Sequence, residues 1–101
     1  MQIKYTAAAR NDLRKIRDYI CNNLSNPIAA SRITKDIIES CDILAEMPLT
    51  GAELSEKIDM ETEYRYLISG HYIVFYVVLN DYIRIDRIID GRTQYLKILF
   101  E

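Results

Sequence analysis

The C-terminal third of the chain contains three runs that are rich in β-branched and aromatic residues and are separated by turn-forming dipeptides. β-Branched and aromatic side chains favour strands, whereas dipeptides of this kind favour tight reversals of the chain. The pattern therefore predicts an antiparallel meander. Its strands and turns are expected at residues 63–69, Ser69-Gly70, 71–79, Asn80-Asp81 and 82–90.

The middle strand of this meander should be central in the sheet. Tyr72 to Leu79 shows no alternation of polar and apolar residues, which is typical of a strand covered on both faces. The next strand does alternate. Ile83, Ile85 and Ile89 should share one face, and Arg87 falls on that same face between Ile85 and Ile89. An arginine is uncommon on a core face, so either a β-bulge turns Arg87 outward or it lies at the rim of a groove.

The N-terminal half predicts a short strand followed by two helices. Residues 2–5 form the strand, and Thr6 is expected to cap a helix over 7–24 with an apolar stripe at helical spacing. Asn26-Pro27 is an N-cap followed by proline at the first helical position, so it should start the second helix, which Pro48 ends. Together these elements predict a helical hairpin.

The order of the elements predicts a single α+β domain over residues 1–101: an N-terminal short strand and a two-helix hairpin packed on a small antiparallel β-sheet. A hairpin can cover only one face of such a sheet. We therefore expect the other face to expose tyrosine, arginine and isoleucine side chains as a binding surface. The stretch at about 50–62 is expected to be an irregular acidic connection.

Charge and composition exclude several classes of protein. The formal net charge is −2 and the isoelectric point is about 5.4, which argues against direct sequence-specific DNA binding by this chain alone. We expect no signal peptide, because the first residues lead into a polar helix without an apolar stretch, and the longest apolar run is far shorter than the ~20 residues that span a bilayer. We expect a cytoplasmic protein without a membrane partner, with Cys21 and Cys41 as reduced thiols.

The sequence contains little recognisable catalytic chemistry. His71 is the only histidine, and nothing near it in the sequence is an obvious nucleophile or orienting partner. The chain lacks a Cys or His pair at ligand spacing and a glycine-rich phosphate loop, so we expect no metal and no cofactor. Arg10, Arg14 and Arg17 form a stripe on the first helix, either as a solvent-facing side or as a site for an acidic partner.

The arginines of the meander have two interpretations. Arg65, Arg87 and Arg92 lie on or just beyond the strands, where they could contact a target. Alternatively, ion pairs with Asp86 or Asp90 would give some of them a structural role.

Taken together, these residues resemble the RelE/ParE superfamily of type II toxin–antitoxin toxins over nearly the whole chain. No single motif is specific, whereas their order and spacing are. The segments that carry the resemblance are Ala8-Ala9-Arg10-Asn11-Asp12-Leu13 with Ile16 and Tyr19-Ile20, Asn26-Pro27 with Ala29-Ala30, Leu44-Ala45-Glu46-Met47-Pro48 with Gly51, Tyr64-Arg65-Tyr66-Leu67, Gly70-His71-Tyr72-Ile73-Val74-Phe75-Tyr76, Ile85-Asp86-Arg87-Ile88 and Gly91-Arg92.

The resemblance implies a cytoplasmic growth-inhibiting toxin that a cognate antitoxin neutralises. RelE-like members cut mRNA in the ribosomal A site without a metal, whereas ParE-like members inhibit DNA gyrase. Ile73, Thr93 and Gln94 stand where RelE-like sequences commonly carry arginine, a basic residue and an acidic residue. The acidic isoelectric point also fits poorly with docking on ribosomal RNA, so the ParE-like branch is favoured.

Three functions therefore remain open, in order of preference. The first is a gyrase-inhibiting toxin, the second a ribosome-dependent metal-free mRNA endonuclease, and the third a non-toxic toxin-fold binding module that acts only with its antitoxin. For the first, the expected target-contact residues are Arg65, Arg92 and Tyr95, and the expected antitoxin-binding residues are Leu96, Ile98, Leu99 and Phe100. For the second, the candidate catalytic residues are Arg65, His71, Arg87, Arg92 and Tyr95.

Overall fold

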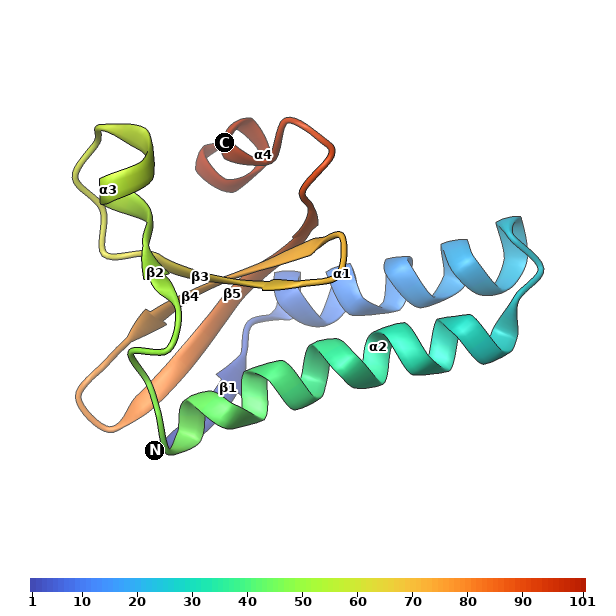
Figure 1. The fold of residues 1–101 in the computed structure, drawn as a ribbon, viewed down its shortest axis with the longest axis horizontal. Helices are drawn as coiled ribbons and strands as arrows, with labels where there is room; N and C mark the ends of the chain where they lie inside the picture. The colour runs from blue at the N-terminus through green and yellow to red at the C-terminus, as the bar shows by residue number, and fades with distance from the viewer.

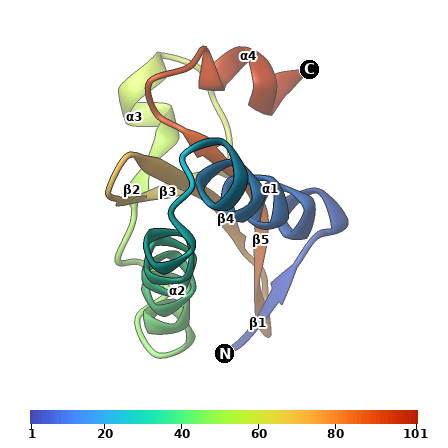
Figure 2. The same ribbon diagram turned by 90° about the vertical axis from the view of Figure 1, so that its right-hand side faces the viewer.

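A five-stranded mixed sheet in the order β1-β5-β4-β3-β2 forms the centre of the computed structural model, which describes residues 1–101. A long helical hairpin packs on one face of the sheet, and two short helices lie on the other (Figures 1 and 2). The elements in chain order are β1 (Gln2–Tyr5), α1 (Ala7–Asp18), the π-helical turn η1 (Tyr19–Asn23), α2 (Pro27–Asp42), the 3-10 turn η2 (Ile43–Ala45), β2 (Ala52–Glu53), α3 (Leu54–Ile58), β3 (Arg65–Ser69), β4 (Tyr72–Val78), β5 (Tyr82–Asp90) and α4 (Tyr95–Phe100).

Both helices of the hairpin begin at the expected caps. The Thr6 hydroxyl accepts a hydrogen bond from the Ala9 amide at 3.1 Å, and the Asn26 side-chain oxygen accepts one from the Ala29 amide at 3.1 Å. Each cap satisfies a backbone donor that the first helical turn leaves without a partner. The hairpin extends well beyond the end of the sheet, at the right of Figure 1.

The three-strand meander is confirmed, with β4 antiparallel to β3 on one side and to β5 on the other. Val74, Phe75 and Tyr76 of β4 are completely buried, as expected for a central strand. The sheet is mixed rather than purely antiparallel, because β1 pairs in parallel with β5.

A β-bulge interrupts the pairing of β4 with β5. Phe75 lies opposite Arg87 while Tyr76 lies opposite Ile85, so Asp86 is the additional residue on β5. Because side chains alternate along a strand, one extra residue reverses the faces of all those that follow. The expectation that Ile89 shares a face with Ile83 and Ile85 is therefore wrong, whereas the expected bulge near Arg87 is present.

The sheet carries a hydrophobic core on each face. The residues of the larger core, between the hairpin and the sheet, are Ala9, Ile37, Cys41, Leu44, Val74, Tyr76, Ile83, Ile85 and Ile88. The second core, on the opposite face, contains Leu54, Ile73, Phe75 and Ile89.

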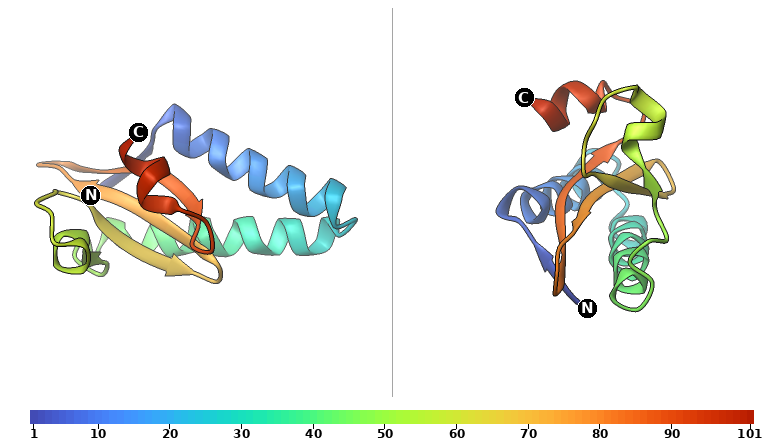
Figure 3. Two further views of the ribbon diagram at one scale, coloured as in Figure 1. Left: turned by 90° about the horizontal axis from the view of Figure 1, so that it is seen from above. Right: turned by 90° about the vertical axis from the view of Figure 1, so that its left-hand side faces the viewer.

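The second core corrects two expectations. The stretch expected to be an irregular connection forms β2 and α3, because Leu54 and Ile58 reach apolar partners on the sheet. The apolar C-terminal tail folds back as α4 on this same face (Figure 3). The face expected to be bare is therefore largely covered by α3 and α4.

Candidate functional site

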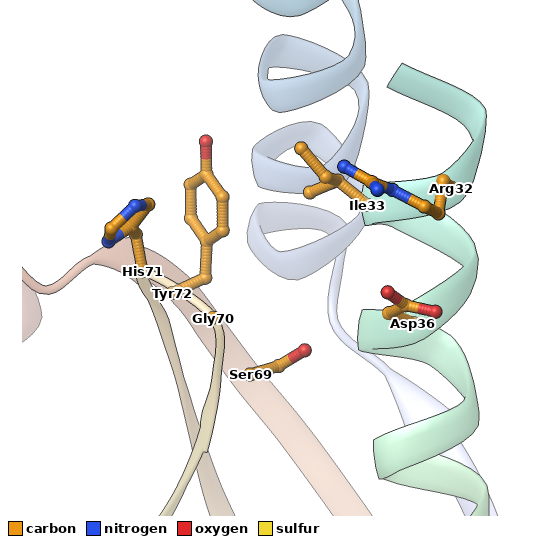
Figure 4. Close-up of a pocket in the computed structure, with 7 residues that line it drawn as sticks. All are labelled: Arg32, Ile33, Asp36, Ser69, Gly70, His71 and Tyr72. Atoms are coloured by element: carbon orange, nitrogen blue, oxygen red, sulfur yellow. The ribbon is translucent and has the colours of Figure 1, made fainter. Parts of the chain in front are cut away.

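A hollow of about 350 Å³ lies between the β3–β4 turn and helix α2 (Figure 4). Gly70 permits this turn, because its φ of 60° lies in the left-handed region that disfavours other residues. In Figure 4, Arg32 and Ile33 extend from α2 toward the Tyr72 ring, and His71 lies beside that ring. The lining residues are Arg32, Ile33, Asp36, Ser69, Gly70, His71 and Tyr72.

Arg92 lies at the same end of the sheet as this hollow. The amide of Gly91 donates to the His71 carbonyl at 2.7 Å, which connects the end of β5 to the turn. The Arg92 guanidinium donates to both carboxylate oxygens of Asp90 at 3.0 and 2.9 Å, and this interaction lowers the pKa of Asp90. The Arg92 side chain nevertheless remains 64% exposed. Arginine, histidine and tyrosine side chains therefore gather at one end of the sheet.

Arg65 lies near the other end of β3 and is held by the chain itself. Its guanidinium donates to the Gly51 carbonyl at 2.8 Å and to the Leu49 carbonyl at 3.3 Å, and it pairs with Glu53 at 3.3 Å. Only 18% of its side chain is exposed. Arg65 thus fixes the loop that leads from α2 to β2, a role that no local feature of the sequence indicates.

Arg87 is paired with a residue from the other end of the chain. Its guanidinium donates to both carboxylate oxygens of Asp12 on α1, at 2.8 and 2.9 Å. A pair with Asp86 or Asp90 was one interpretation for the three strand arginines, and it holds only for Arg92, which pairs with Asp90. Arg65 pairs with Glu53 and Arg87 with Asp12, whereas the partner of Asp86 is Arg84.

The remaining candidates lie on or beside α4. The Tyr95 ring stacks on Phe75 with a centroid distance of 5.9 Å. Leu96, Ile98 and Leu99 are partly buried against the second core. Phe100 is 44% exposed, and its ring meets that of Tyr64 edge-on at 5.9 Å.

The five candidate nuclease residues do not converge. Arg65 pairs with Tyr76, whereas Ser69 pairs with Tyr72 beside the turn. At about 3.3 Å per residue, this places Arg65 roughly 13 Å along the strand from the end that carries His71. Arg87 is engaged with Asp12 at the edge of the sheet. Only His71 and Arg92 lie at the same end.

Three further observations concern the chain as a whole. Cys21 and Cys41 are both free thiols, as expected. None of the helices has the length and apolar character needed to cross a membrane. The structure brings together no group of three or more His, Cys, Asp or Glu side chains that could hold a metal ion.

Comparison with known proteins identifies the family. The family model described as ParE toxin of type II toxin-antitoxin system, parDE, matches residues 3–95. A chain of the solved structure described as the chromosomal ParDE TA system from P. aeruginosa is 26% identical, with a TM-score of 0.75 over 89% of this chain and 95% of that one. No curated protein sequence gives a significant match. With 93 consecutive residues covered by the family model, this chain belongs to the ParE toxin family of type II toxin–antitoxin systems.

Proposed function

We propose that this toxin arrests growth by binding and inhibiting DNA gyrase, and that a cognate antitoxin neutralises it. Membership of the ParE family favours gyrase over the ribosome as the target. The observation that carries the proposal is the separation of Arg65 from His71 and Arg92 along the sheet. A metal-free nuclease needs several cationic and proton-transferring groups around one phosphate, and the five candidate residues of this chain are not arranged around one point.

Arg92 and Tyr95 are the proposed target-contact residues. Arg92 lies just beyond the end of β5 with 64% of its side chain exposed, and Tyr95 follows three residues later at the start of α4. Arginine and tyrosine are both enriched among the residues that anchor protein–protein interfaces. Arg65, the third expected contact, would act chiefly by holding the loop that includes Gly51.

The antitoxin is proposed to bind α4 and the apolar surface that remains around it. Leu96, Ile98 and Leu99 are only partly buried on the sheet. Further large apolar side chains are exposed on the helical hairpin, on the loop after it and on β3, and a partner would remove them from water. They include Tyr19, Leu24, Ile28, Ile43, Met47, Leu49 and Ile68.

A comparison of two assays tests the target. Purified toxin should inhibit gyrase supercoiling at concentrations that leave translation intact, and Arg92→Gln should weaken this inhibition. Lys15→Gln, an exposed change on the helical hairpin, serves as the control.

Two results would contradict the gyrase proposal. Defined cuts in A-site codons that disappear in Arg65→Ala or Tyr95→Phe would establish the mRNA endonuclease instead. A protein that binds its antitoxin but neither inhibits gyrase nor arrests growth would be the non-toxic binding module.

A further inference from the structure

Asp90 holds the Arg92 side chain in a fixed orientation. The Nε of Arg92 donates to one carboxylate oxygen of Asp90 at 3.0 Å, and its Nη2 donates to the other at 2.9 Å. The Arg92 backbone amide donates to the first of these oxygens at 2.9 Å. Because a guanidinium and a carboxylate are both planar, two parallel hydrogen bonds set the plane and the direction of the arginine head group.

The backbone on which this pair stands is fixed as well. The Asp90 carbonyl accepts hydrogen bonds from the Thr93 amide at 3.1 Å and from the Thr93 hydroxyl at 2.6 Å. The Gly91 amide donates to the His71 carbonyl at 2.7 Å. The turn after β5 is thus closed on itself and connected to the turn between β3 and β4.

The pair of Asp90 with Arg92 does not connect distant parts of the fold. Arg87 and Asp12, by contrast, are 75 residues apart and join strand β5 to helix α1. Asp90 and Arg92 are two residues apart, and every hydrogen bond of the Asp90 carboxylate goes to Arg92. An exposed pair between such close neighbours contributes little to stability, so its main effect is on Arg92 itself.

The pairing leaves one side of the guanidinium free. Asp90 engages Nε and Nη2, whereas Nη1 has no partner within the chain. Nη1 carries two N–H donors, and the side chain that bears it is largely exposed. An arginine that is already oriented loses less conformational entropy on binding than a mobile one. Arg92 is therefore a preorganised donor at the end of the sheet.

The charge of the pair favours an uncharged acceptor in the partner. The guanidinium and the carboxylate together carry no net charge, so at physiological salt they attract a carboxylate of another molecule only weakly. Such a carboxylate would also approach the negative charge of Asp90. A peptide carbonyl or a side-chain amide oxygen can accept from Nη1 without this repulsion.

We propose that Asp90 is a positioning residue for the target contact, and that it orients Arg92 so that Nη1 donates to an uncharged carbonyl oxygen of gyrase. This inference rests on the proposed inhibition of gyrase through Arg92. Asp90 itself does not touch the target.

Binding of the full-length chain to purified gyrase tests the role of Asp90. Arg92→Gln should weaken binding at least about tenfold, and Asp90→Asn, which leaves Arg92 in place but mobile, should weaken it about three- to tenfold. Glu39→Gln makes the same change in net charge and removes the exposed partner of Lys35, so it should bind within about twofold of the parent. Thermal melts verify that the variants are folded.

Two further variants separate positioning from an independent effect of Asp90. Asp90→Asn/Arg92→Gln should bind no more weakly than Arg92→Gln alone, because Asp90 acts only through Arg92. Arg92→Lys keeps the positive charge but cannot bond to Asp90 at two points. It should therefore bind within about threefold of Arg92→Gln.

The outcomes separate the positioning role from the gyrase proposal. If Asp90→Asn binds like the parent while Arg92→Gln does not, the positioning role is overturned and the target contact stands. Tighter binding by Asp90→Asn would show that the target presents a carboxylate, which the released charge of Arg92 attracts, and would overturn the uncharged acceptor. Additive losses in the double variant, or full binding by Arg92→Lys, would also overturn the proposal.

Failure of the gyrase proposal has a different signature. If the parent chain does not bind gyrase, or if Arg92→Gln binds as tightly as the parent, the target contact at Arg92 fails and the inference fails with it. Should Asp90→Asn not fold, the comparison of Arg92→Lys with Arg92→Gln decides.

Discussion

Arg87 and Asp12, which are 75 residues apart in the sequence, form a two-point ion pair between strand β5 and helix α1. Asp12 also accepts a hydrogen bond from the Ile88 amide at 2.9 Å, immediately after the bulge. One carboxylate thus accepts hydrogen bonds from both a guanidinium and a backbone amide, at the place where the bulge interrupts the pairing of β5 with β4. The contact fixes α1 against the bulged strand and so holds the helical hairpin on the sheet.

Removing the Arg87 guanidinium should destabilise the fold. In Arg87→Gln the Asp12 carboxylate, which is 10% exposed, would lose its cationic partner. We expect the free energy of unfolding to fall by about 2–3 kcal/mol and the melting temperature by roughly 10–20 °C. Lys35→Gln removes an exposed pair and should cost less than about 0.5 kcal/mol. Indistinguishable urea-unfolding curves for the two variants would contradict a structural role for Arg87.

Gly51 should not tolerate a side chain. A Cβ at this position would lie 2.5 Å from the Tyr76 hydroxyl and 2.6 Å from the Tyr66 carbonyl. Gly51→Ala must displace the loop that Arg65 holds, at a cost of about 2 kcal/mol. Gly70→Ala provides the comparison, because its Cβ would meet open space and only its positive φ would cost about 1 kcal/mol. If denaturant unfolding showed Gly70→Ala to be less stable than Gly51→Ala, this explanation would be wrong.

The stability of the toxin should decrease in alkaline solution. Burial raises the pKa of Cys41 from 9.0 to about 11, and it raises that of Tyr64 from 10.0 to about 12. For each group, the first value applies to the unfolded chain and the raised value to the folded chain. At a pH between the two, the unfolded chain has released a proton that the folded chain still holds. The stability that the group contributes is therefore complete below its unfolded pKa and is lost as the pH rises through its folded pKa. Urea unfolding from pH 8 to pH 11 should show the decline, and Tyr64→Phe should flatten its upper part. A slope unchanged by Tyr64→Phe would exclude this tyrosine as a cause.

Arg65 and Arg92 should respond differently to substitution. Arg92→Gln removes an exposed side chain, so the melting temperature should stay within a few degrees while growth arrest weakens. Arg65→Gln loses contacts to two backbone carbonyls and one carboxylate, and it should cost about 1–2 kcal/mol. Thermal melts and a growth assay on both variants measure the two effects. Full toxicity of stable Arg92→Gln would remove this residue from the target contact.

Expression without a partner should give self-associating protein. The exposed apolar side chains of Leu24, Ile28, Met47 and Leu49 on the hairpin and the loop after it, and of Ile68 on β3, have no cover in the free chain. Size-exclusion chromatography with and without the neighbouring gene product should show aggregates replaced by a defined complex. A stable monomer with no affinity for that product would argue against the proposed neutralisation.

The sequence by itself determined the local elements. Residue type, apolar spacing and turn signals predicted two helices and four strands, and Thr6, Asn26 and Pro27 defined where the helices begin. These signals succeed because a cap or a turn involves residues only a few positions apart. The unbroken apolar run of β4 likewise indicated its central place, since only a strand covered on both faces can bury every side chain.

The tertiary structure alone decided how these elements meet. The bulge at Asp86 sends Ile89 to the second core, although its spacing from Ile85 in the sequence indicates a shared face. The pairing of Arg87 with Asp12 and the return of α4 to the sheet depend on contacts between distant segments, which no local pattern encodes. The same contacts engage the strand arginines with carboxylates and leave Arg10, Arg14 and Arg17 on the hairpin without strong partners, because pairing depends on which charges the fold brings within hydrogen-bond distance.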